Sequence, residues 1–144
     1  MPFPAREPTF LPLTVAAART AADSQVGPPE RASARVVQRR AEEANAAAAA
    51  CWSALLGGCE SAGRLGLPAR LRALSEATSV YVGGTWWLGD GSTHRRRVSA
   101  AEDRIGEAIF EGDGAEFAEA FIGYDQAVAT AVVRVQSRLG SPTA

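Results

Sequence analysis

Residues 113–139, DGAEFAEAFIGYDQAVATAVVRVQSRL, carry the clearest helical pattern in the chain and decide the fold that we expect. Apolar side chains recur along this stretch at steps of three and four residues, which places them on one face of an α-helix. They are Phe117, Phe121, Tyr124, Val128, Ala131, Val135 and Leu139. We therefore predict a long helix that begins at an Asp113 N-cap, with Glu116 three residues later, and ends at Gly140.

A second long helix is expected over residues 30–56, because a proline pair precedes this stretch and a glycine pair follows it. Its apolar positions also alternate steps of three and four, which is a heptad pattern made mostly of alanine. They are Ala34, Val37, Ala41, Ala44, Ala48, Cys51 and Leu55. Since the two helices have similar lengths, we expect them to lie side by side and antiparallel.

The fold class is predicted to be mainly α, a helical bundle of about four helices built on these two heptad-patterned helices. A third helix is expected over 68–78, with Pro68 in its first turn, and a fourth over 99–111, opened by Ser99 and Glu102 as a capping box. Residues 79–88 are ambiguous. They continue a helical spacing, yet Gly83-Gly84 also suits the turn of a short β-hairpin.

Length and composition favour one domain. The chain has 144 residues, and we predict a single helical domain over 30–140, a tail over 141–144 and a proline-rich N-terminal arm or tail over 1–29. One short helix is expected in the arm, around Thr14 to Asp23. With 30 alanines, the composition favours closely approaching helices over a core of bulky side chains, so stability is expected to depend on a partner subunit.

The charges disfavour a dedicated nucleic-acid binder, because such proteins usually carry net positive charge and this chain has a net charge of −1. All fifteen basic residues are arginine, as in a GC-rich coding sequence. Acids dominate residues 98–127, whereas arginines dominate residues 31–97, so the two parts could attract each other within the fold or between subunits. No apolar run is long enough to span a membrane, and Pro12 interrupts the apolar start, so a cytoplasmic location is expected.

Two patches are candidate binding sites. The first is the aromatic group Tyr81, Trp86 and Trp87, which lies among glycines and would suit contact with a protein partner. The second is His94, Arg95, Arg96 and Arg97, expected in a loop or short strand ahead of the fourth helix, where guanidinium groups would suit an anion.

No catalytic or metal-binding motif accompanies them. Cys51 and Cys59 are not spaced as zinc ligands, and His94 is the only histidine, so we predict no metal, no cofactor and no catalytic residues. The leading interpretation is a non-enzymatic helical interaction or scaffold module that binds a protein or itself as a homodimer. The alternative is a regulator that binds an anionic ligand or nucleic acid through residues 94–97.

Trp87-Leu88-Gly89 reads W-x-G between long helices, and in this respect the chain resembles the WXG100 family. That resemblance implies a small secreted helical-hairpin protein. The Tyr-x-x-x-Asp/Glu secretion signal of the family is not completed after Tyr124, because position 128 is valine.

Overall fold

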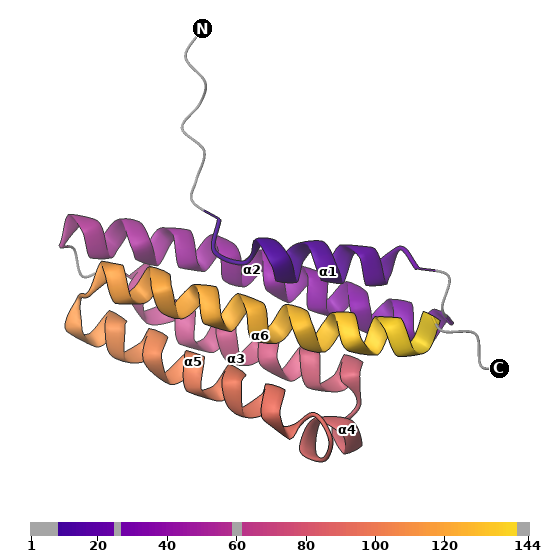
Figure 1. Ribbon diagram of the computed structural model, residues 1–144. Helices are drawn as coiled ribbons and strands as arrows, with labels where there is room; N and C mark the ends of the chain where they lie inside the picture. The colour runs from indigo at the N-terminus through magenta and orange to yellow at the C-terminus, as the bar shows by residue number, and fades with distance from the viewer. Residues whose placement is uncertain (1–8, 25–26, 59–61, 141–144) are drawn as a thin grey trace, which may run out of the picture.

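The computed structural model describes residues 9–24, 27–58 and 62–140, and these residues form six helices and no strand (Figure 1). The helices are α1 (Pro12–Ala22), α2 (Pro28–Gly57), α3 (Ala62–Val82), α4 (Gly84–Leu88), α5 (Ser92–Glu111) and α6 (Gly114–Gly140). The mainly α prediction is therefore confirmed.

Four long helices run alternately up and down, and the shorter α1 lies lengthwise along α2 and α6 on one side of the bundle (Figure 1). Helix α2 packs mainly against α3, α6 packs mainly against α5, and α1 packs against both α2 and α6. The expectation that α2 and α6 lie side by side is wrong in this respect: they run antiparallel but make few direct contacts, because α1 packs against both of them.

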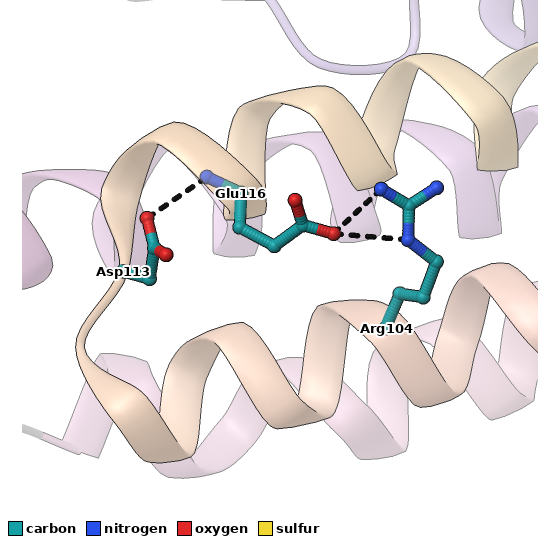
Figure 2. A network of polar contacts seen from close by, with 3 residues as sticks. All are labelled: Arg104, Asp113 and Glu116. Atoms are coloured by element: carbon teal, nitrogen blue, oxygen red, sulfur yellow. Dashed lines mark hydrogen bonds and ion pairs between the residues drawn. The ribbon is translucent and has the colours of Figure 1, made fainter.

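Helix α6 buries the face that its sequence predicts. Every member of the predicted set from Phe117 to Val135 is buried, and the side chain of Leu139 lies outside the described residues. The helix begins beside Asp113, whose Oδ1 accepts a hydrogen bond from the Glu116 N–H at 3.0 Å (Figure 2). The Glu116 carboxylate does not complete a capping box. It binds Arg104 of α5 instead, with Oε1 2.9 Å from Nε and 2.5 Å from Nη2.

Helix α2 buries its alanine-rich face in the same way. All seven positions of the predicted set, from Ala34 to Leu55, are buried. The helix ends at Gly58, which takes the left-handed conformation with φ of 67°, as the glycine pair predicts. Small side chains on this face let α3 and α1 approach α2 closely, so only a thin layer of side chains separates these helices.

The β-hairpin over residues 79–88 is not formed. Residues 79–82 complete α3, and Gly83 turns the chain with φ of 91° into the short helix α4. Both readings of the sequence need a glycine with positive φ at this turn, so Gly83 alone does not distinguish them. Tyr81 and Val82 are buried as part of α3, and this burial favours the helix over the hairpin.

Two further boundaries differ from the predicted ones. Pro68 is the seventh residue of α3, so it lies inside the helix and not in its first turn. Helix α5 starts at Ser92, so residues 94–97 are helical, and Ser99 is an internal helix residue. The arginines are good helix formers, and the predicted capping residue Glu102 is drawn to Ser75 of α3.

The segment before α1 is held by side chains from two other helices. Asn45 Oδ1 of α2 accepts hydrogen bonds from the N–H groups of Phe10 and Leu11, at 2.7 and 3.0 Å. Asp125 of α6 caps the first turn of α1 by accepting from the N–H groups of Leu13 and Thr14 at 3.0 and 2.8 Å. The predicted helix around Thr14 is therefore part of the bundle.

An aromatic cluster closes the end of the bundle under Phe10. The Phe10 ring lies 5.8 Å from Trp52 of α2 and 5.5 and 5.3 Å from Phe117 and Phe121 of α6. Phe10 and Leu11 thus dock onto their own domain. Among the described residues, no helix is both long and apolar enough to cross a membrane.

Candidate functional site

The connection from α3 to α5 positions the predicted aromatic patch. Gly91 is buried against the Trp86 ring: a Cβ atom at this position would lie 2.5 Å from two ring carbons. The Gly91 N–H also donates to the Trp86 carbonyl. Only glycine, which has no Cβ atom, therefore lets the backbone at position 91 lie this close to the Trp86 ring.

The three aromatic residues have different environments. Tyr81 and Trp87 are buried in the core, and burial, together with the charge of Glu30, raises the pKa of Tyr81. Trp86 is half-buried and lies between two rings, 6.4 Å from Trp87 and 5.6 Å from His94. Of the predicted partner-binding set, Trp86 alone keeps an appreciable exposed surface, and its role in partner binding remains a prediction.

The second predicted patch opens onto a groove between α5 and α6, which we call the basic groove. Its volume is about 670 Å³. Helix α5 lines it with His94, Arg97, Ala100, Ala101 and Arg104, and α6 lines it with Gly123, Gln126, Ala127 and Thr130. The small residues keep the groove open, while the basic residues follow one another along α5 at helical spacing.

The four residues of the predicted anion site separate once they are helical. His94 and Arg97, three residues apart, both line the basic groove, whereas Arg95 and Arg96 do not. Arg95 Nε donates to the Trp87 carbonyl at 3.3 Å, and Arg96 is exposed. An α-helix sends adjacent side chains in different directions, which is why a run of basic residues does not make one site.

His94 is an electrostatically unusual group. Its Nδ1 is buried and has no hydrogen-bond partner among the described residues. Burial of the ring, then the charges of Arg134 and Arg97, hold the pKa of His94 below its ordinary value of 6.5. These effects favour the neutral imidazole, which stacks on Trp86 at the wall of the basic groove.

Arg134 was not part of the predicted site. It lies on the exposed side of α6, forty residues after His94, and only the packing of α6 on α5 brings its charge close to the imidazole. Arg104, by contrast, lines the groove but is already paired with Glu116 (Figure 2).

A partly buried polar cluster joins α3, α5 and α6. Ser75 Oγ donates to Glu102 Oε1 and lies 3.0 Å from the Tyr124 hydroxyl, which also donates to the Leu71 carbonyl at 3.2 Å. Burial raises the pKa of Glu102 and of Tyr124. A cavity of about 220 Å³ beside Glu102 is small, and we interpret this cluster as a polar contact that fixes how the three helices pack.

Two apolar grooves lie on the other side of α6, against α1. Their volumes are about 490 and 350 Å³. Large apolar side chains at these grooves are exposed to solvent: Leu13 at 50 %, Ile122 at 60 % and Val133 at 46 %. Gln126 and Thr130 border both the larger apolar groove and the basic groove, so the outer side of α6 forms a ridge between them.

The part of the chain that the structure describes holds no group of three or more histidine, cysteine, aspartate or glutamate side chains placed to bind a metal ion. Cys51 is buried, and Cys59 lies outside the described residues. No protein-family model, curated protein or solved structure matches the chain, so the interpretation of its surfaces depends on its own residues.

Proposed function

We propose that this protein is a cytoplasmic, non-enzymatic helical interaction module that pairs with a second copy of itself through the outer ridge of α6. The observation that carries the proposal is the exposure of Ile122 and Val133 on this ridge, next to Leu13 of α1. Soluble monomers seldom gather large apolar side chains beside open grooves without a partner.

The ridge has the spacing of a second helical seam. Glu119, Ile122, Gln126, Thr130 and Val133 follow one another at steps of three, four, four and three, and all are exposed. A helix with apolar positions on two faces packs one face against its own core and offers the other to a second helix. The proposed contact is therefore coiled-coil-like.

Charge along the ridge favours a second copy as the partner. Glu119 lies near one end of the ridge and Arg134 near the other, both exposed and about 22 Å apart along the helix. If two α6 helices pair antiparallel about Gln126, Glu119 of each copy meets Arg134 of the other. A two-fold interface forms every such contact twice, so each dimer would contain two Glu119–Arg134 ion pairs.

The experiment measures molar mass by light scattering over a range of protein concentrations. The wild type should dimerise, and Glu119→Arg should weaken the dimer about five- to thirtyfold, because two exposed pairs become repulsive at a cost of about 1–2 kcal/mol. Arg134→Glu should act similarly. The double variant Glu119→Arg/Arg134→Glu should restore dimerisation, since it exchanges the charges and keeps them complementary.

Ile122→Asp tests the apolar part of the ridge and should give a monomer. Glu76→Arg is the matched control, because Glu76 is exposed on α3 away from α6. A wild type that stays monomeric at every concentration, or a double variant weaker than either single variant, contradicts the proposal.

A further inference from the structure

Two cationic groups without ion-pair partners lie at the basic groove: Arg97 lines it, and Arg134 lines the larger apolar groove next to it. Arg97 forms no ion pair with a described residue, and neither does Arg134, whereas Arg104 is satisfied by Glu116. The charges of Arg97 and Arg134 both act on His94, whose Nδ1 is buried without a hydrogen-bond partner. Unpaired guanidinium groups that converge on one imidazole from two helices form a region of positive potential beside a solvent-filled space of about 670 Å³.

We infer that the basic groove binds a small molecule through an oxyanion group, a phosphate or a carboxylate, which His94 and Arg97 hold by hydrogen bonds. Guanidinium groups match the oxygen geometry of both anions, and their charge-assisted hydrogen bonds are about twice as strong as neutral ones. The groove has the volume of a small-molecule site, and its Ala and Gly residues leave room for the rest of such a molecule.

The imidazole is prepared for this role by its surroundings. Stacking on Trp86 fixes the plane of the ring, and Gly91 fixes Trp86 in turn. A neutral imidazole still carries one N–H donor, so it binds an oxyanion without first taking up a proton. Because Nδ1 is buried, we assign the contact with the anion to Nε2.

A bound anion changes the titration of His94 in a known direction. The positive charges of Arg134 and Arg97 now hold the pKa of His94 down. A negative charge in the groove offsets them and favours the imidazolium, so the pKa of His94 rises when the anion binds.

A small ligand fits this surface better than a nucleic acid. The net charge of the chain is −1, and the groove runs from His94 and Arg97 toward the exposed acids Glu107 and Glu111 at the other end of α5. A polyanion that follows the groove would be repelled there, whereas one oxyanion at His94 would not.

The test uses the imidazole itself as the probe. His94 is the only histidine, so in untagged protein its Cε1 proton gives a single imidazole signal in an NMR spectrum. Inorganic phosphate and, in a parallel series, acetate are added while sodium chloride keeps the ionic strength constant. We expect a saturable shift of this signal and a higher pKa of His94 with at least one of the two anions, and the series that saturates identifies the oxyanion class.

Arg97→Met is the informative variant and Arg96→Met its matched control. Both arginines are exposed on α5, but Arg97 alone lines the groove. Arg97→Met should weaken anion binding at least about fivefold, because it removes a charge-assisted hydrogen bond, while Arg96→Met should leave it unchanged. No saturable shift with either anion, or equal losses in the two variants, overturns the inference.

The inference depends on a different arginine from self-association, although Gln126, Thr130 and the charge of Arg134 contribute to both surfaces. Arg97 does not lie on the α6 ridge, so Arg97→Met should dimerise like the wild type. An Arg97→Met variant that dimerises normally but binds anions weakly therefore separates the groove from the ridge.

Discussion

Asp125 of α6 accepts two hydrogen bonds from Thr14 of α1, at 2.8 Å from the backbone N–H and 2.7 Å from the hydroxyl. The two residues are 111 positions apart, and both are buried. A third bond comes from the Leu13 N–H. Asp125 thus acts as the N-cap that α1 lacks locally, since Leu11 at the cap position offers no side-chain acceptor.

Replacing this carboxylate should destabilise the protein. Asp125→Ala leaves two N–H groups without acceptors and the Thr14 hydroxyl with only the backbone carbonyl of residue 125, so we expect a loss of about 2–4 kcal/mol in the free energy of unfolding. Urea denaturation measures the loss. Asp125→Asn keeps one oxygen acceptor and should lose less. The exposed neighbour Gln126→Ala is the control, and equal stability of Asp125→Ala and Gln126→Ala would refute this role.

Adding a methyl group at Gly91 should disturb the aromatic connection. The new Cβ would lie 2.5 Å from the Trp86 ring, so the ring must move and the variant Gly91→Ala should lose about 1–3 kcal/mol. Tryptophan fluorescence and thermal unfolding measure both effects. Gly84→Ala is the matched control, because no atom lies near its added Cβ and α4 gains a better helix former. A Gly91→Ala variant with unchanged fluorescence and melting temperature would contradict the close packing.

The titration of His94 should make stability depend on pH. Its pKa is lower in the folded state than the ordinary 6.5, so between these two values the unfolded chain binds more protons than the folded one. Stability is therefore full above pH 6.5 and decreases as the pH falls below it. Urea denaturation at a series of pH values measures this slope. His94→Gln should flatten the slope in this window, and a slope that His94→Gln leaves intact would assign it to other groups.

Removing the Ser75 hydroxyl should raise the pKa of Glu102 further. Burial already raises this pKa, and the hydrogen bond from Ser75 opposes that shift by favouring the carboxylate. In Ser75→Ala the carboxylate loses its donor, so the protonated form is favoured up to a higher pH. Carbon-detected NMR titration of the Glu102 carboxyl measures this change. Ser79→Ala, on the same helix but with its hydroxyl bound to the Glu76 carbonyl, should leave the titration unchanged.

The spacing of apolar residues predicted correctly the helices that bury one continuous apolar face. The apolar spacing in α6 and α2 predicted which side chains face the core, and the glycine pair predicted where α2 ends, because these features depend on residues within a turn or two of each other. The secondary structure of residues 79–98 was harder to predict. Short apolar runs and paired glycines suit several local structures, so the burial of Tyr81 and Trp87 against the rest of the bundle had to decide.

The sequence by itself determined that this protein is mainly helical and which face of each long helix is apolar, since helical periodicity is a local property of the chain. Only the tertiary structure decided which helices are neighbours, and with that the contacts that matter for the proposed sites. Asp125 reaches Thr14, and the charge of Arg134 reaches His94, only after α1 and α5 have packed on α6. Such contacts join residues that are far apart in the chain, and no local spacing encodes them.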